Sequence, residues 1–199
     1  MPDSRPLALF DLDGTLTWRD TLSDLLVREF GIGRCLTVGV RLAPSLLGVL
    51  IGRVHRDTAK VQVLTHFFGG MPEADFTAIA QHYGREHLNK LLRRQAREQL
   101  DWHREQGHRV IVVSASVSDW IAPWAKAEGI ELIATELARK NGHITGDLAG
   151  ENCRGPEKVR RLKARLNLSE YTPIYAYGDT DGDTAMLAIA DHPVYRGLR

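Results

Sequence analysis

Four acidic residues follow two short apolar runs of the chain, Asp11 and Asp13 after the first and Asp179 and Asp183 after the second. If the runs are neighbouring strands of a parallel sheet, these carboxylates meet at its carboxyl edge, where α/β proteins bind ligands. Carboxylates that lie close together raise one another's pKa unless a cation lies among them. Hard oxygen ligands suit Mg²⁺, so the pattern predicts a magnesium site that also receives a phosphate group.

Two further residues complete this predicted site. Ser114 ends a third apolar run, and Lys158 stands near the start of a predicted helix. Alone, Ser114 would be an ordinary strand-end hydroxyl and Lys158 an ordinary surface lysine. A calcium loop is excluded, because it needs glycine at its sixth position and glutamate at its twelfth. Counted from Asp179 or from Asp11, the chain has neither residue at those positions.

The hydrophobic pattern predicts one strand, then a long helical stretch, then alternating strands and helices. We expect strands over residues 7–12, 109–113, 130–134, 173–177 and near Val194, with a hairpin over residues 135–149. We expect helices over residues 21–30, 34–51, 58–68, 73–83, 88–106, 119–128, 156–166 and 183–190. Alternating strands and helices favour a parallel sheet covered by helices on both of its faces.

The predicted fold is therefore an α/β, Rossmann-like parallel sheet with helices on both faces, plus an inserted all-helical cap. Residues 1–16 and 89–199 would form the catalytic core, and residues 17–88 would form the cap.

Composition limits the class of protein. The chain has 199 residues, of which 43% are hydrophobic, so it can bury a core. Its net charge of +1 argues against a generic nucleic-acid-binding protein. The two cysteines offer no disulfide framework, and residues 1–5 lead into an apolar run too short for a signal peptide. We expect a cytoplasmic protein.

Four segments together resemble the motifs of the haloacid dehalogenase superfamily. They are residues 10–16 (FDLDGTL), 114–116 (SAS), 157–158 (EK) and 178–183 (GDTDGD). Their order and wide spacing are similar to the branch with a helical cap after the first strand, subfamily IB, which contains phosphoserine phosphatase.

The resemblance implies a role for each matching residue. Asp11 would be the nucleophile, and Asp13 the general acid and later the base. Dehalogenases of the superfamily lack this second aspartate, so Asp13 favours phosphate chemistry. The remaining roles are Mg²⁺ binding by Asp11, the Asp13 carbonyl and Asp179; phosphate binding by Ser114, Ala115 and Lys158; and support by Asp183 and Thr15.

The substrate is less well defined by the sequence. Asp20, and Arg56 or Lys60, stand about where phosphoserine phosphatases carry substrate-binding residues, but Ser114–Ala115–Ser116 replaces the usual Ser-Gly-Gly. Residues 34–53 are largely apolar with flanking arginines, and together with residues 152–158 they resemble the subgroup that includes bacterial phosphatidylglycerophosphate phosphatases. The apolar segment is either a buried cap helix, at a dimer interface for instance, or a helix that contacts the inner face of a membrane without spanning it.

These observations predict a Mg²⁺-dependent phosphomonoester hydrolase that forms an aspartyl-phosphate on Asp11. Its substrate would be a small phosphorylated metabolite or a phospholipid headgroup, and the enzyme a monomer or homodimer. A phosphotransferase or mutase with the same intermediate, and a non-catalytic metal-dependent regulatory module, are the alternatives.

Overall fold

The strand that leads to the first acidic motif is buried on both sides. In a computed structural model of the chain, which describes residues 5–198, this strand is β1 (Arg5–Phe10). Ala8 and Phe10 belong to the core on one face of the sheet, and Leu7 and Leu9 to the core on the other. Apolar residues at every position are typical of a strand covered by helices on both faces. Residues 1–4, part of the N-terminal segment considered above as a signal peptide, lie outside the described residues, as does residue 199.

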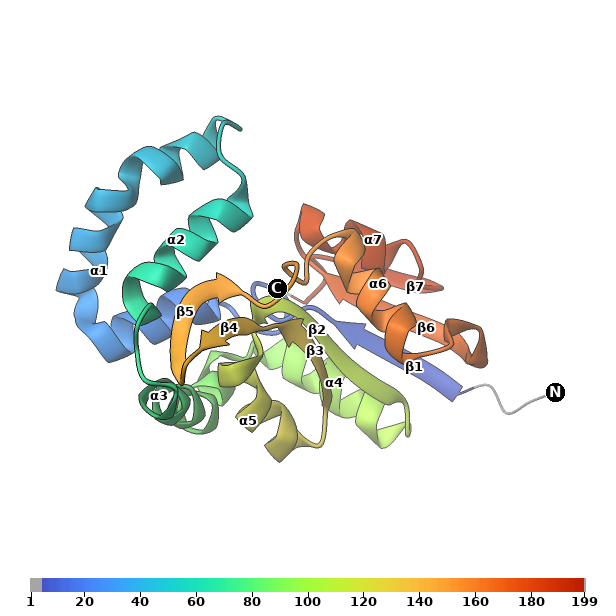
Figure 1. Cartoon of the computed structure of the whole chain (residues 1–199). Coiled ribbons are helices and arrows are strands. Elements are labelled where there is room, and N and C mark those ends of the chain that lie inside the picture. The colour runs from blue at the N-terminus through green and yellow to red at the C-terminus, as the bar shows by residue number, and fades with distance from the viewer. Residues whose placement is uncertain (1–4, 199) are drawn as a thin grey trace.

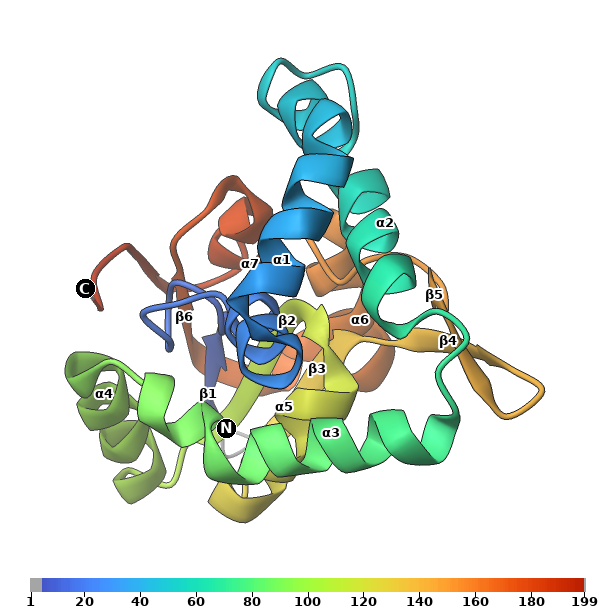
Figure 2. The same cartoon turned by 90° about the vertical axis from the view of Figure 1, so that its left-hand side faces the viewer.

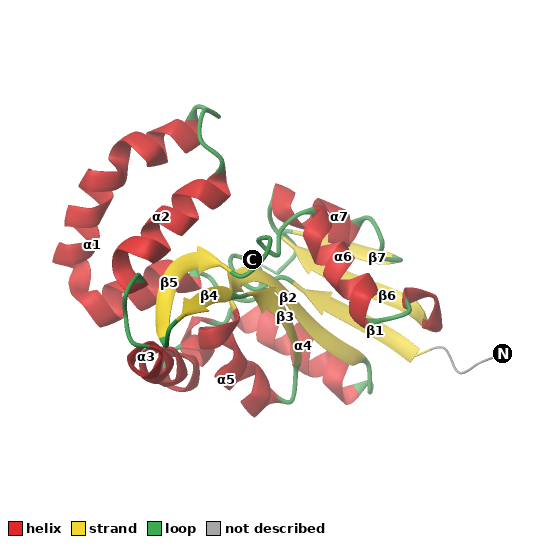
Figure 3. Ribbon diagram, viewed as in Figure 1, coloured by secondary structure: helices red, strands yellow, loops and turns green. Residues whose placement is uncertain are grey.

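The central sheet has five parallel strands in the order β3-β2-β1-β6-β7 (Figures 1 and 3). Its other strands are β2 (Arg109–Val117), β3 (Glu131–Thr135), β6 (Tyr171–Gly178) and β7 (His192–Tyr195). β1 lies between β2 and β6, so the ends of three motif-bearing strands are neighbours at one edge. The predicted hairpin is confirmed as β4 (Leu137–Lys140) and β5 (His143–Leu148).

Helices cover both faces of this sheet, as predicted. α4 (Arg94–Glu105) and α5 (Ser118–Glu128) contribute Leu100 and Trp120 to one core. α6 (Pro156–Arg165) and α7 (Thr184–Leu187) contribute Leu162 and Met186 to the opposite core (Figure 1). The fold is thus an α/β parallel sheet of the Rossmann-like type.

Three helices fill the stretch predicted as a cap. They are α1 (Thr21–Leu50), α2 (Arg56–Phe68) and α3 (Glu73–Glu86). α1 and α2 lie side by side and rise above the sheet, whereas α3 lies along α5 (Figure 2). The division at residues 16/17 and 88/89 stays a prediction.

Four predicted helices differ from the structure, in three places. Residues 21–30 and 34–51 form one element, α1, bent at Gly31, which has non-helical φ and ψ angles of 78° and 153°. The helix expected over 88–106 is divided into a 3₁₀ turn, η1 (Leu88–Leu91), and α4. It breaks because the backbone there bonds the first loop instead: Arg93 N–H donates to Leu16 O at 2.8 Å.

The third difference is at the end of the chain. The helix expected over 183–190 shortens to a 3₁₀ turn, η3 (Asp181–Asp183), and the four residues of α7. Another 3₁₀ turn, η2 (Leu168–Glu170), precedes β6.

Candidate active site

Asp11 stands at the carboxyl end of β1 and contacts a buried lysine. Its backbone N–H donates to Tyr177 O of β6 at 2.9 Å, which continues the sheet by one residue. The Lys158 Nζ lies 2.6 Å from Asp11 Oδ1 and 2.7 Å from Asp183 Oδ1. The Lys158 side chain is 1% exposed, so one ammonium group links two buried carboxylates.

Local backbone geometry brings Lys158 to this position. Pro156 begins α6, a position where its fixed φ and missing N–H are tolerated. Gly155 precedes it with a positive φ of 59° and donates its N–H to Gly182 O at 2.7 Å. The first turn of α6 is thereby joined to the loop after β6, which carries Asp183.

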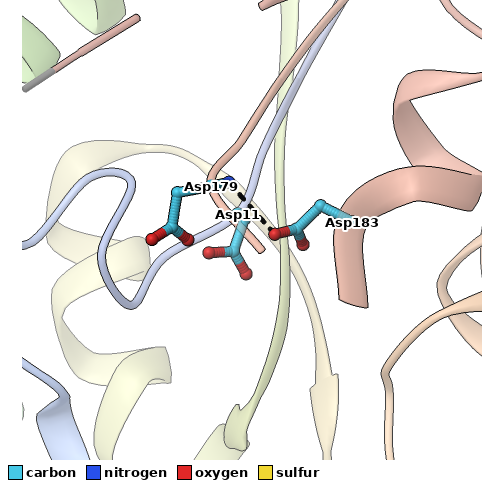
Figure 4. A group of neighbouring side chains, drawn as sticks. All are labelled: Asp11, Asp179 and Asp183. Carbon is cyan, nitrogen blue, oxygen red and sulfur yellow. Dashed lines mark hydrogen bonds between the residues drawn. The ribbon is translucent and has the colours of Figure 1, made fainter. Parts of the chain in front are cut away.

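The three aspartates Asp11, Asp179 and Asp183 form one buried cluster (Figure 4). They offer carboxylate oxygens that all lie within 4.8 Å of one another. Asp183 Oδ2 accepts hydrogen bonds from the N–H groups of Asp179 at 3.2 Å and Thr180 at 3.0 Å, and from the Thr180 hydroxyl at 3.0 Å. With Lys158 on its other oxygen, Asp183 orients the loop that carries Asp179.

Gly14 and Thr15 shape the opposite side of this cluster. A Cβ on Gly14 would lie 2.4 Å from Asp179 Oδ2, and the φ of Gly14 is +85°, so this position requires glycine. The Thr15 hydroxyl donates to Asp179 Oδ1 at 3.4 Å. Both residues therefore fix where the Asp179 carboxylate lies.

The charges of the cluster are strongly coupled. Burial raises the pKa of Asp11 to about 6, although the Lys158 charge opposes this shift. Burial alone would lower the pKa of Lys158, but Asp11 and Asp183 outweigh it and hold that pKa above its ordinary value. Burial acts to raise the pKa of Asp183, but Lys158 and the Thr180 hydrogen bonds hold it below its usual range. The Lys158 ammonium favours the ionised form of Asp11, which is the form that a carboxylate nucleophile needs.

Asp13 lies apart from the three-aspartate cluster and has different partners. Its Oδ1 accepts the N–H of Thr21 at 2.6 Å, and its Oδ2 accepts the Ser116 hydroxyl at 2.5 Å. Burial, then the nearby charge of Asp20, raise the pKa of Asp13 to about 7. A carboxyl group that keeps its proton near neutrality suits general acid and base catalysis.

Sequence reasoning missed the residues that hold Asp13. The Ser116 hydroxyl lies 3.1 Å from that of Thr21, which in turn accepts from Trp120 Nε1 at 3.2 Å. The second serine of Ser114–Ala115–Ser116 was the available signal, since it stands at the same strand end as Ser114.

The two other predicted phosphate-binding positions lie on β2. The fully buried Ser114 Oγ accepts the N–H of Ser116 at 3.0 Å. Ala115 lines the cavity above the aspartates, and its carbonyl accepts from Lys60 Nζ at 2.5 Å.

The three predicted cap residues line the same cavity, which has a volume of about 710 Å³. Asp20 caps α1 by accepting the Ser23 N–H at 2.7 Å. Lys60 Nζ also donates to Asn152 Oδ1 at 2.8 Å, and burial lowers the pKa of Lys60 to about 8. The Arg56 guanidinium lies 3.6 Å from the Asp181 carboxylate.

The donor set of the cluster fits a divalent cation. Three buried carboxyl groups converge at this point, and the Lys158 ammonium contacts two of them, Asp11 and Asp183. Carboxylate oxygens are the ligands preferred by Mg²⁺ and Ca²⁺. Asp11, Asp179 and Asp183 could therefore hold a metal ion.

This sheet, its acidic edge and the cavity enclosed by α1 and α2 define an α/β phosphatase. The family model of haloacid dehalogenase-like hydrolases matches residues 8–188, and the chain belongs to that family.

Two curated relatives match nearly the whole chain. Protein CicA of Caulobacter vibrioides is 36% identical over 196 residues, covering 97% of this chain and 86% of CicA. Probable phosphatase Rv3661 of Mycobacterium tuberculosis is 28% identical over 209 residues, covering all of this chain and 72% of Rv3661.

Solved structures share the fold. A protein of unknown function from Bordetella pertussis has a TM-score of 0.80 at 26% identity, covering 96% of this chain and 89% of that one. A phospho-aspartyl intermediate analogue of phosphoserine phosphatase has a TM-score of 0.65 at 20% identity, covering 97% and 86%. Because the identity to phosphoserine phosphatase is only 20%, this second similarity shows a shared fold.

Proposed function

We propose that this phosphatase is a Mg²⁺-dependent phosphomonoesterase that passes its substrate's phosphoryl group through Asp11. The observation that carries the proposal is the contrast between Asp11 and Asp13. Asp11 is joined to the ammonium of Lys158 at 2.6 Å, whereas Asp13 accepts hydrogen bonds from the neutral Thr21 N–H and Ser116 hydroxyl. Two carboxyl groups whose environments differ in this way are typical of a nucleophile and a general acid.

In the first step, an oxygen of Asp11 attacks phosphorus while the bond to the leaving oxygen breaks. Asp13 gives its proton to that oxygen, so the alcohol departs neutral. In the second step, Asp13 takes a proton from water as the water oxygen attacks the phosphoryl group. The bond between Asp11 and phosphorus then breaks, and inorganic phosphate is released.

Charge stabilisation supports both steps. Lys158, Ser114 and the backbone at Ala115 bind the phosphate oxygens in this proposal. Bound Mg²⁺ would offset repulsion between the anionic nucleophile and the phosphate dianion. Its ligands would be Asp11, the Asp13 carbonyl and Asp179, with Asp183 and Thr15 holding that arrangement.

The proposed substrate is a small phosphorylated metabolite or a phospholipid headgroup. Asp20, Arg56 and Lys60 would contact its leaving group, because all three line the cavity above the aspartates. Residues 17–88 would act as the cap that covers it.

We propose a cytoplasmic enzyme that contacts the inner face of a membrane through residues 34–53. Ile32, Leu36, Val40 and Leu47 of α1 are each more than half exposed, and the nearby Arg34, Arg41 and Arg53 are exposed as well. α1 is long and apolar enough to cross a membrane by length and composition alone, which is weak support for a span. Its first residue, Thr21, bonds Asp13 in the active site, which favours peripheral contact.

The test is phosphate release from a panel that includes phosphoserine, sugar phosphates and phosphatidylglycerophosphate in detergent, with Mg²⁺ or with EDTA. We expect Mg²⁺-dependent turnover of at least one compound and none by the Asp11→Asn protein. Turnover by pure, folded Asp11→Asn would overturn the mechanism. Transfer of phosphate to an added acceptor in preference to water would indicate a phosphotransferase.

A further inference from the structure

The cavity above the aspartates has a chemically mixed lining. Its floor is polar and contains Asp11, Asp13 and Lys158. α1 and α2 add six apolar side chains to this lining, those of Leu22, Leu46, Val49, Leu50, Ala59 and Val63, beside the charged Arg56, Asp57 and Lys60 of α2. Leu46 is 40% exposed and Leu50 is 82% exposed, although both line the catalytic cavity. A polar metabolite would leave these surfaces in contact with water.

A second hollow adjoins these apolar side chains between the two helices. It has a volume of about 170 Å³, and we call it the α1–α2 hollow. Leu46 and Val63 line both spaces, so the hollow and the catalytic cavity adjoin at these two side chains. Leu26, Val38, Leu42 and Phe67 extend it, and none of the residues that line it is charged.

The hollow is a space that the packing of α1 against α2 leaves unfilled. Protein interiors usually leave few voids larger than a water molecule, because unfilled space forfeits dispersion contacts. Here α1 and α2 leave an apolar space that shares Leu46 and Val63 with the lining of the catalytic cavity. An apolar binding site with a few polar groups at one end is the usual form of a site for an amphiphilic small molecule.

We propose that the phosphomonoester substrate carries an alkyl or acyl chain, and that this chain lies in the α1–α2 hollow. The inference rests on the proposed phosphatase function and adds the chemical class of the leaving group. The phosphate end lies beside Asp11, the chain passes between Leu46 and Val63, and its end is covered by α1 and α2. Burial of the chain contributes affinity in proportion to the apolar area removed from water.

The test measures kcat/KM for ethyl, hexyl and decyl phosphate, with Mg²⁺ and below the concentrations at which micelles form. A fully buried methylene contributes about a fourfold gain in binding. We expect at least a tenfold rise from ethyl to decyl phosphate. Equal turnover of all three would overturn the inference and leave the phosphatase function standing. No turnover of any phosphomonoester by folded protein would refute the proposed function itself.

Two variants locate the chain. Val63→Trp fills the boundary between the two spaces, so we expect the decyl-to-ethyl ratio to fall towards one. The matched control is Val40→Trp, because Val40 is 77% exposed on α1 and lines neither space. It should keep the full ratio. A decyl-to-ethyl ratio that is unchanged by Val63→Trp would overturn the proposed location of the alkyl chain.

A second readout needs neither turnover nor a core substitution. Cys35 lines the hollow and is partly exposed, whereas Cys153 is fully buried. We expect dodecylphosphonate, which has no hydrolysable ester, to slow the reaction of Cys35 with a thiol reagent several-fold. Ethylphosphonate should have no such effect, and Cys35→Ser should remove the signal. If Cys35 reacted with the thiol reagent at the same rate in the presence of either phosphonate, the inference would be contradicted.

Discussion

The Lys158→Met substitution should destabilise the metal-free protein strongly. Lys158 Nζ contacts Asp11 at 2.6 Å and Asp183 at 2.7 Å, and all three side chains are buried. Removing one partner of a buried ion pair leaves uncompensated charge, which costs about 3–5 kcal/mol in other proteins. For a chain of this length, each kcal/mol corresponds to about 2–4 °C in Tm, so we expect a loss on the order of 10 °C.

The loss of stability caused by Lys158→Met should depend on pH. Burial raises the pKa of Asp11 to about 6 against the opposing charge of Lys158, so removing Lys158 raises that pKa further. A carboxyl group with a raised folded-state pKa destabilises the protein once pH exceeds its unfolded pKa, because the folded state then resists ionisation. The difference between Lys158→Met and wild type should therefore be larger at about pH 7.5 than at about pH 5.

The assay is urea unfolding in EDTA at both pH values, monitored by circular dichroism. Lys163→Met is the matched control, because Lys163 is exposed on the same helix. The double substitution Asp11→Asn/Lys158→Met should recover part of the loss, since contacting groups are not additive. A Lys158→Met protein as stable as wild type at the higher pH would refute the reasoning.

Three further outcomes follow from the same contacts. Ser116→Ala removes a hydrogen bond that lowers the pKa of Asp13, so the alkaline limb of the plot of kcat against pH should move to higher pH. An unmoved limb would contradict the role of Asp13 as general acid. Hydrogen bonds from two arginines of α6 lower the pKa of Glu157 to about 2. The ionised Glu157 therefore stabilises the fold above its unfolded pKa, and this stabilisation is lost as pH falls towards 2. Glu157→Gln should thus lower the urea midpoint much more at neutral pH than at pH near 2, and equal losses at both pH values would count against the ion pair. Asp179→Asn should weaken Mg²⁺ binding at least tenfold in calorimetric titration, and unchanged affinity would remove Asp179 from the metal site.

Much of the catalytic edge could be predicted from the sequence because strand ends converge in a parallel sheet. Asp11, Lys158 and Asp183 are far apart along the chain, yet each follows or begins a recognisable element, and the structure brings them into contact. The pairing of β1 with both β2 and β6 provides this convergence.

Contacts that depend on loop geometry were not predictable in this way. The hydrogen bond from Ser116 to Asp13 requires β2 to continue three residues beyond its predicted end, and it requires α1 to begin beside the same carboxylate. The break before α4 arises from backbone hydrogen bonds to residues 16–18, which no local pattern records.

The space between α1 and α2 also lay beyond sequence reasoning. The apolar pattern of residues 34–51 indicated a helix but not which of its faces would meet a neighbour. The structure shows that Leu46 lines both cavities while Val40 lies outside both, a difference set by the packing of α1 against α2.

The central claim, a covalent phosphoryl group on Asp11, is tested most directly in an Asp13→Asn protein. With 4-nitrophenyl phosphate and Mg²⁺, the leaving group needs no proton, so the first step should proceed while the second lacks its base. Mass spectrometry of the acid-quenched protein should then find one phosphoryl group, located on Asp11 and missing when Asp11→Asn is added. Unmodified protein during continuing phosphate release, or a phosphoryl group on another residue, would contradict the account.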